Sequence, residues 1–255
     1  MKIELIDYSK DAVNLWLRTK NTRLGFDKDP STWTDSEKME HLEYAKNTIK
    51  SSMEFVDYTF RISGVSRAFT HQFVRTRTGS YAQESQRTVD VRGSEFVVPE
   101  SIVGNEEALL AWETADEAIR DAYSKMVDLG IPVGDARGIL PTNVSTSIVA
   151  KFNLRTLSDM AKTRLCTRTQ GEYQEVFKQM KKAVVEVHEW ADDLLVVGCE
   201  SQGSCIFPNY GPKSCPIYPA TIPVELVRAK RIEIRKLFDE TKFAANPIAK
   251  DGKAS

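Results

Sequence analysis

The sequence predicts an α+β domain, in which a few strands near the N-terminus precede a series of long helices. Residues 2–7 and 53–62 alternate between apolar and polar side chains, which is typical of strands with one buried face. Residues 105–129 instead repeat apolar side chains at helical spacing, from Leu109 to Leu129. These three segments define the predicted class.

The other elements follow from periodicity and from residues that begin or end helices. Thr34 or Ser36 is expected to cap a helix, and residues 23–34 are expected to form a loop. The Gly79-Ser80 pair is expected to end the helix that starts near residue 67. In chain order, helices are expected at about 9–19, 36–49 and 67–79, a strand at 95–98, and helices at 105–129, 145–164, 168–197 and 224–242.

The charge balance points to a small ligand rather than to nucleic acid. Lys and Arg number 35 against 36 Asp and Glu, so the chain has no overall basic field. The N-terminal residues lack an apolar signal core, and no run approaches the roughly 18 apolar residues of a membrane span. We therefore expect a cytoplasmic protein with neither nucleic-acid nor membrane partners.

The four cysteines form no CxxC motif, and we expect them to be reduced. Cys166 falls on a helical pattern and is expected to be a buried structural residue rather than a nucleophile. Cys199, Cys205 and Cys215 leave a zinc site open, although their spacing matches no standard pattern and a fourth ligand is not evident. We assign no metal ligand.

A first arginine-rich stretch, residues 67–87, combines cations with hydrogen-bonding side chains. Arg67, His71 and Arg75 are four residues apart and share one helix face, and Arg77 follows. Residues 83–87 are a dense run of amide, hydroxyl and charged groups. The stretch indicates a pocket for an anionic ligand, and the alternative is a solvated charged face.

A second arginine-rich stretch, residues 153–172, adds another polar set. Arg155 and Asp159 are spaced to pair on one helix face. Arg164, beyond them, projects elsewhere. Surface arginines with nearby partners would explain this pattern, but two such stretches favour a polyanionic cofactor and an anionic substrate. No GxGxxG or GxxxxGK[ST] motif supports a dinucleotide or P-loop phosphate site.

The two stretches resemble the signatures of the flavin-dependent thymidylate synthases. That family has Arg-His-Arg, seven residues and then Ser, and this chain has Arg75-Thr76-Arg77, TGSYAQE and then Ser85. A second family run, RxCxRxQxE, corresponds to Arg164, Cys166, Arg168, Gln170 and Glu172. The resemblance covers roughly residues 35–180. The departures are Thr76 for the central His, Thr88 for an aromatic residue, Phe55 for a His, and Asp159 for an Asn.

The resemblance implies a small antiparallel sheet packed with long helices, a single catalytic domain over residues 1–223, and a helical extension and tail over 224–255. It implies reductive methylation of dUMP with FAD, NADPH and 5,10-methylenetetrahydrofolate, in a homotetramer with shared active sites. The implied FAD contacts are Ser51, Arg75, Thr76, Arg77, Gln83, Asn153, Arg155 and Asp159. The implied dUMP contacts are Gln72, Arg75, Gln83, Glu84, Ser85, Gln86, Arg87, Arg137 and Arg164.

Within this set, Arg164 and Ser85 are the expected catalytic residues. Arg164 is expected to stabilise negative charge as the uracil N3 ionises, and Ser85 is expected to lie near the pyrimidine. The departures, Thr76 above all, keep two alternatives open. One is a relative that forms another one-carbon adduct, hydroxymethyl-dUMP. The other is a nucleotide-binding protein that has lost its flavin.

Overall fold

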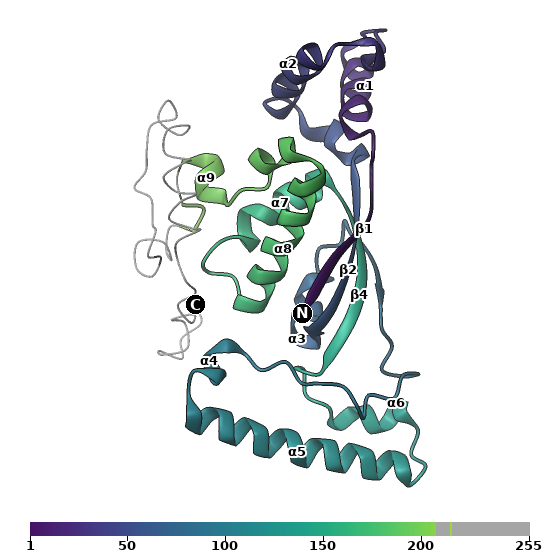
Figure 1. Ribbon diagram of the computed structural model, residues 1–255, viewed down its shortest axis with the longest axis vertical. Helices are drawn as coiled ribbons and strands as arrows, with labels where there is room; N and C mark the ends of the chain where they lie inside the picture. The colour runs from purple at the N-terminus through teal and green to yellow at the C-terminus, as the bar shows by residue number, and fades with distance from the viewer. Residues whose placement is uncertain (204, 208–214, 216–255) are drawn as a thin grey trace.

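The computed structural model describes residues 1–203, 205–207 and 215 (Figure 1). Its centre is a four-stranded sheet with the order β1-β2-β4-β3, in which all neighbours are antiparallel. The strands are β1 (Lys2–Tyr8), β2 (Asp57–Ser66), β3 (Ser80–Gln83) and β4 (Ser145–Asn153). With the helices around this sheet, the predicted α+β class is confirmed.

The helices fall before, between and after the strands. The α-helices are α1 (Ala12–Leu24), α2 (Asp35–Lys46), α3 (Arg67–Phe73), α4 (Glu100–Val103), α5 (Glu106–Asp128), α6 (Val133–Ala136), α7 (Leu154–Arg164), α8 (Gly171–Val187) and α9 (Gly198–Gln202). Four 3₁₀ helices join them: η1 (Pro30–Thr32), η2 (Lys50–Phe55), η3 (Arg137–Ile139) and η4 (Glu189–Leu194). None of the helices in the described ranges is long and apolar enough to cross a membrane.

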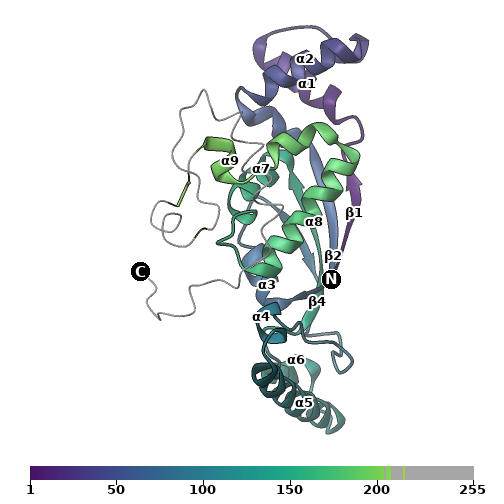
Figure 2. The same ribbon diagram turned by 60° about the vertical axis from the view of Figure 1, so that its left-hand side comes forward.

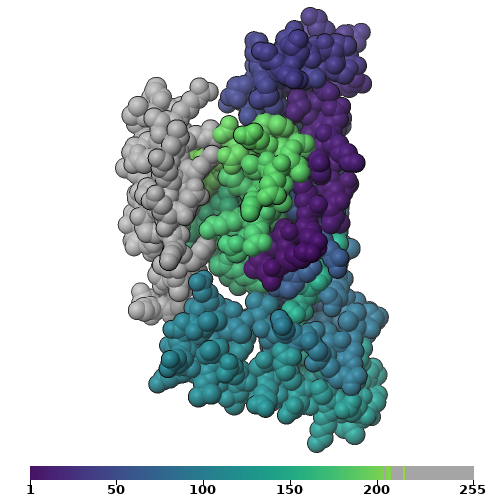
Figure 3. Space-filling view, viewed as in Figure 1, coloured from purple at the N-terminus to yellow at the C-terminus, as the bar shows by residue number. Residues whose placement is uncertain are grey.

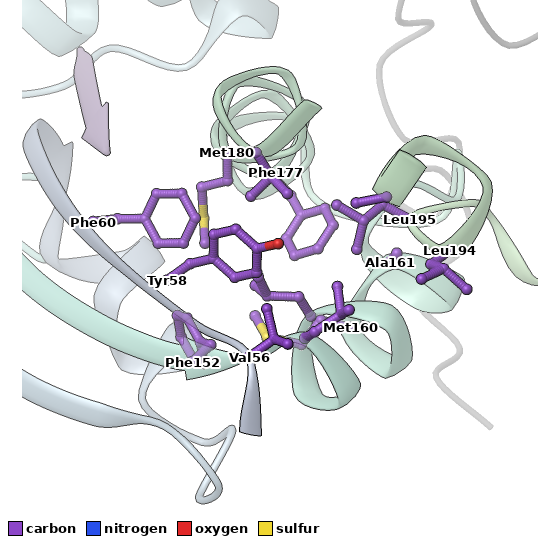
Figure 4. Close-up of a cluster of buried hydrophobic side chains, with 14 of the residues drawn as sticks. Val56, Tyr58, Phe60, Phe152, Met160, Ala161, Phe177, Met180, Leu194 and Leu195 are labelled. Carbon is purple, nitrogen blue, oxygen red and sulfur yellow. The ribbon is translucent and has the colours of Figure 1, made fainter. Parts of the chain in front are cut away.

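The hydrophobic core lies between one face of the sheet and the helices α7 and α8 (Figure 1). On β2 the predicted alternation is confirmed, because Tyr58, Phe60 and Ile62 are fully buried. Figure 4 shows Tyr58 and Phe60 pointing toward Phe177 and Met180 of α8. Burying a large apolar side chain contributes about 1.5–3 kcal/mol, so this layer anchors the sheet to its helices.

Residues 145–153 form a strand, and the expectation of a helix over 145–164 is wrong for this half. β4 pairs with both β2 and β3 and therefore lies inside the sheet. Its buried positions are Thr146, Ile148, Ala150 and Phe152. Only two of these are large and apolar, so the two-residue period is weak in the sequence. The helix α7 starts only after Asn153, whose side-chain oxygen accepts a hydrogen bond from the Thr156 N–H at 2.8 Å.

Several other boundaries also differ from expectation. The helix α3 ends at Phe73 rather than near Gly79, and residues 80–83 form the short strand β3, which has no strong apolar alternation. The expected strand at 95–98 is only an isolated bridge between Phe96 and Val144. Met53–Phe55 belongs to η2 rather than to a strand, α1 extends to Leu24, and α8 ends at Val187. The expected helix at 224–242 and the predicted tail lie outside the described residues.

The molecule is elongated, with α1 and α2 at one end and α5 at the other (Figures 1 and 2). Thr34 begins α2 with a reciprocal cap to Glu37, as expected. The predicted helix over 105–129 is confirmed by α5, although Tyr123 is its only fully buried side chain. Leu110 and Leu129, which are 66% and 72% exposed, lie on and just beyond this helix. Figure 3 shows the teal α5 region as a separate mass below the core.

Candidate active site

The first arginine-rich stretch folds back on itself, so that α3 lies over the strand β3. Arg67 Nη2 donates to the Glu84 carbonyl at 2.7 Å, and Gln83 Nε2 donates to Thr70 Oγ1 at 2.8 Å. Farther along, the Tyr81 hydroxyl donates to the Thr76 carbonyl at 2.6 Å. These bonds arrange the whole stretch along the edge of β4, with Thr76 toward the Asn153 end of that strand.

The two arginine-rich stretches meet in the folded chain. Gln72 Nε2 on α3 donates to Gln170 Oε1 at 3.0 Å. The Glu172 carboxylate accepts the Ser66 backbone N–H at 2.7 Å and the Ser66 hydroxyl at 2.5 Å. A carboxylate at this position also complements the positive N-terminal end of α3. Glu172 therefore has a structural function, holding the start of α3 against α8.

Arg164 lies on an aromatic platform at this junction. Its guanidinium carbon is 4.3 Å from the ring centroid of Tyr173, which is the spacing of a cation–π contact. Tyr173 is fully buried, and its ring packs edge-on against Phe69 and Phe73. Burial raises the pKa of the Tyr173 hydroxyl, and Arg164 and Thr76 oppose that rise. Arg164 of the second stretch is thus held where that stretch packs against the first.

One end of the site, which we call the Arg87 end, comprises Arg67, residues 84–87 and Arg137. The Arg87 backbone N–H donates to Ser85 Oγ at 3.2 Å, and Gly134 of α6 lies against the Arg87 backbone. Burial lowers the pKa of the Arg67 guanidinium; Glu84 opposes this shift and Arg137 adds to it. The predicted dUMP-binding groups of this end are therefore neighbours.

Two buried donors at the Arg87 end have no hydrogen-bond acceptor in the described part of the chain. They are Arg67 Nε and Gln86 Nε2. Buried donors in proteins are almost always paired, and an unpaired one costs roughly 1–3 kcal/mol. A ligand acceptor would satisfy either group, which makes this end a candidate binding site.

The other end of the site, the Asn153 end, comprises Ser51, Asn153, Arg155 and Asp159. The expected Arg155–Asp159 pair is wrong: Arg155 pairs with Glu54, and Asp159 pairs with Lys162 at 2.6 Å. The reason is that η2 brings an acidic side chain close to the start of α7. The polar groups of this end already have partners, apart from the half-buried Ser51, for which no bond is found within the described ranges.

Arg75 and Arg77 are exposed on the turn after α3, and Thr76 between them is half-buried. Among the described residues, no hydrogen bond or ion pair links these three to the Asn153 end. The predicted flavin-binding residues therefore fall into two groups that no bond connects within the described residues. Among the predicted dUMP-binding residues, Gln83 and Glu84 are bonded to α3 through Thr70 and Arg67.

Two cavities in the described part of the chain lie away from the predicted residues. One of about 560 Å³ is lined by α8 and η4 residues such as Lys178 and Asp192. A second cavity, of about 150 Å³, is polar and is lined in part by Lys50 and Lys162. Lys50 precedes Ser51 in the sequence, and Lys162 forms an ion pair with Asp159. Neither cavity contains a predicted contact residue, so neither defines the site.

Cys166 is buried, as expected, and burial raises the pKa of its thiol. Burial also raises the pKa of Cys199 to about 12. Cys215 approaches this region, with its Sγ 3.4 Å from Thr167 Oγ1. Within residues 1–203, 205–207 and 215, no group of three or more His, Cys, Asp or Glu side chains is arranged to hold a metal ion. The open zinc alternative gains no support from this arrangement.

Sequence reasoning missed two tyrosines of the site. Tyr81 fixes the Thr76 carbonyl, and Tyr173 supports Arg164. Tyr81 lies in the spacer of the first motif and Tyr173 follows Glu172 of the second, but a lone tyrosine in a helical or strand pattern normally indicates core packing. The signal that could have identified them is their position within or beside the two motifs. A tyrosine there brings a hydroxyl group to the site, and buried hydroxyl groups generally require a partner.

Comparison with known proteins places the chain in a family. A family model described as "Thymidylate synthase complementing protein" matches residues 4–190. A protein named flavin-dependent thymidylate synthase from Geobacter sulfurreducens is 36% identical over 190 residues, covering 72% of this chain and 82% of that relative. Proteins of the same name from Pyrococcus horikoshii and Sulfolobus acidocaldarius are 38% identical over 176 residues (65% of this chain, 72% of the relative) and 34% identical over 201 residues (74% of each).

A solved structure supports the fold. The crystal structure of a UMP/dUMP methylase PolB from Streptomyces cacaoi, bound with 5-Br dUMP, superposes with a TM-score of 0.66. The two chains are 20% identical, and the match covers 76% of this chain and 93% of that one. On the extent of the family match and the identity to its relatives, this chain belongs to the flavin-dependent thymidylate synthase family.

Proposed function

We propose that this protein is a thymidylate synthase that methylates dUMP to dTMP, with FAD as cofactor, 5,10-methylenetetrahydrofolate as one-carbon donor and NADPH as reductant. The observation that carries the proposal is the meeting of the two arginine-rich stretches at Tyr173, whose ring lies under Arg164 and whose hydroxyl is near Thr76. The family match supports the same function.

The Arg87 end fits a nucleotide monophosphate. Arg67, Arg87 and Arg137 provide positive charge, and guanidinium groups bind phosphate oxygens through paired N–H donors. The orphaned donors Arg67 Nε and Gln86 Nε2 match the acceptor-rich phosphate and uracil groups of dUMP. Ser85 Oγ accepts a backbone N–H, which leaves its hydroxyl proton for a ligand.

Arg164 is the proposed catalytic residue. A guanidinium that is held before the reaction begins stabilises developing negative charge without the cost of reorganisation. We assign it to the uracil edge, where it stabilises the anion formed as N3 ionises. The guanidinium stabilises this anion by its charge and its N–H donors, and it does not itself accept the N3 proton.

The charge of the predicted flavin-binding turn suits FAD. Arg75 and Arg77 are exposed cations on one turn and suit the diphosphate of FAD. When bound, the flavin supplies the hydride that completes the new methyl group. Thr76 offers a hydroxyl where the family motif has an imidazole, so it forms a shorter and uncharged contact.

A homotetramer with shared active sites would join the two separated flavin-binding groups. Within the described part of one chain, no hydrogen bond or ion pair joins Arg75–Arg77 to the Asn153 end. The half-exposed apolar stripe of α5 supports association, because Leu110 remains exposed in the isolated chain. We propose that Ser51, Asn153, Arg155 and Asp159 of one subunit complete the FAD site of another.

Product analysis tests the proposal. The purified protein is incubated with FAD, dUMP, 5,10-methylenetetrahydrofolate and NADPH. The nucleotides are then separated by chromatography and identified by mass spectrometry. The expected product is dTMP. Hydroxymethyl-dUMP without dTMP would instead establish the altered-product alternative, to which Thr76 points. Absence of flavin absorbance after FAD addition and gel filtration would leave only a nucleotide-binding protein.

A further inference from the structure

Tyr173 is in contact with both arginine-rich stretches. Its ring lies 4.3 Å from the Arg164 guanidinium carbon, and its hydroxyl is faced by the Thr76 side chain. Arg164 belongs to the proposed nucleotide contacts, whereas Thr76 belongs to the proposed cofactor contacts. A single buried side chain therefore lies between groups that the proposed reaction must bring together.

The ring of Tyr173 is held rigidly. Phe69 and Phe73 of α3 pack edge-on against it, with centroid distances of 5.0 and 5.7 Å. A guanidinium stacked on a fixed ring loses most of its rotational freedom before any ligand binds. The platform consequently determines the direction in which Arg164 presents its N–H donors.

The hydroxyl of Tyr173 is unusual because the residue is 0% exposed and its oxygen forms no hydrogen bond of ordinary geometry among the described residues, although the Thr76 and Arg164 side chains lie close enough to lower its pKa. An unpaired buried hydroxyl lowers stability, and phenylalanine would fill the same space without that cost. Tyr58, also fully buried, shows the ordinary arrangement, since its hydroxyl lies 2.9 Å from His188 Nδ1. The Tyr173 hydroxyl lowers the stability of the unliganded protein and lies beside two predicted contact residues. This combination indicates that the hydroxyl forms a hydrogen bond when ligands are bound.

We propose that Tyr173 is a positioning residue that couples the nucleotide and flavin sites, its ring orienting Arg164 and its hydroxyl pairing with Thr76 when both ligands are bound. This inference rests on the proposed function for the identity of the two ligands. It adds a specific consequence: dUMP strengthens FAD binding, and by reciprocity FAD strengthens dUMP binding by the same factor.

The test measures that factor directly. FAD dissociation constants are determined by fluorescence with and without saturating dUMP for the wild type, Tyr173→Phe, Thr76→Val and the double variant. In Tyr173→Phe the effect of dUMP on the FAD dissociation constant falls at least about threefold relative to the wild type. The double variant is no worse than the poorer single variant, because both substitutions remove one interaction.

Thermal unfolding of the unliganded protein provides a second readout. Tyr173→Phe raises the melting temperature, since it removes an unsatisfied buried hydroxyl, whereas the matched control Tyr58→Phe lowers it and leaves the coupling unchanged. Tyr173→Leu removes the platform and reduces kcat by roughly 100-fold, as loss of an aligned catalytic donor does.

Three outcomes overturn the inference: wild-type coupling in Tyr173→Phe, additive effects in the double variant, or near-normal kcat in Tyr173→Leu. Failure of the proposed function gives a different result, because the wild type itself then does not bind FAD and dUMP or does not form dTMP. The two failures are therefore distinguished by the wild-type measurements alone.

Discussion

The Arg87 end and the Asn153 end of the site differ in how far their polar groups are satisfied within the chain. At the Arg87 end, Arg67 Nε and Gln86 Nε2 are buried and have no acceptor among the described residues. At the Asn153 end, Asn153 caps α7 and Arg155 pairs with Glu54. A ligand at the first end fills vacant hydrogen-bond positions, whereas a ligand at the second must replace existing pairs.

This difference distinguishes two sets of predicted binding residues that the sequence motifs do not distinguish. Both ends carry residues at the positions of the family motifs, but among the described residues only the Arg87 end has buried donors without an acceptor. Exposed ion pairs such as Arg155–Glu54 contribute less than about 1 kcal/mol, so a ligand or a second subunit displaces them at low cost. The Asn153 end is therefore compatible with a site that forms only in an assembly.

The largest effect is expected at Arg164, which lies on the Tyr173 ring where the two arginine-rich stretches meet. Arg164→Ala reduces kcat at least about 100-fold, because it removes a preorganised positive charge from the developing anion. Circular dichroism and thermal unfolding remain close to those of the wild type, since the guanidinium forms no ion pair with any residue that the structure describes. Arg168→Ala is the matched control and retains turnover, because the Arg168 guanidinium stacks on Phe207 instead. Near-normal turnover in Arg164→Ala contradicts the assignment.

The next largest effect is expected at Gln86, one of the two buried donors without an acceptor at the Arg87 end. Gln86→Leu raises the dUMP dissociation constant about tenfold, which corresponds to the loss of one hydrogen bond of roughly 1.4 kcal/mol. It does not lower the free energy of unfolding, because Gln86 Nε2 has no partner in the described chain. Calorimetric titration and urea unfolding measure the two quantities.

Gln83→Leu provides the contrast to that substitution. Gln83 Nε2 already donates to Thr70 Oγ1, so its loss lowers the free energy of unfolding by about 1 kcal/mol. If Gln86→Leu instead destabilises the protein to the same extent, then Gln86 is a structural residue and the comparison between the two ends loses its basis.

A smaller effect is expected at Thr76. Thr76→His restores the imidazole of the family motif and tightens FAD binding about fivefold, the value of one additional hydrogen bond of about 1 kcal/mol. Fluorescence titration with FAD measures the change. An unchanged dissociation constant shows that other residues have rebuilt this part of the pocket.

The smallest effect concerns the Asn153 end. Glu54→Gln frees Arg155 for a ligand and strengthens FAD binding by no more than about threefold, because the pair that it removes is exposed. Asp128→Asn, which removes another exposed arginine pair at the C-terminal end of α5, is the control and leaves FAD binding unchanged. Weaker FAD binding in Glu54→Gln means that Glu54 itself supports the site.

The strand β2 and the helix α5 could be predicted from the sequence, because each carries a strong apolar period of one type. β4 could not, since its buried face includes Thr146 and Ala150, and Ile148 with Phe152 also fits a helix. The short strand β3 has no period at all and exists because β4 and α3 hold it.

The site shows the same division between local and long-range information. The grouping of residues 83–87 is local in sequence and was predictable. The partners of Arg155 and Arg164 were not, because Glu54 lies 101 residues from Arg155 and Tyr173 looks like an ordinary core residue. Contacts made across the chain decide which polar groups are still free to bind a ligand.

The position of β3 at the edge of the sheet gives an experimental handle on the site. An edge strand has one neighbour, so about half of its backbone amides lack a partner strand. Such amides exchange with deuterium much faster than those of the internal strand β4. Because Ser80–Gln83 lies between the two ends of the site, slower exchange in this segment would report ligand binding in the unmodified protein.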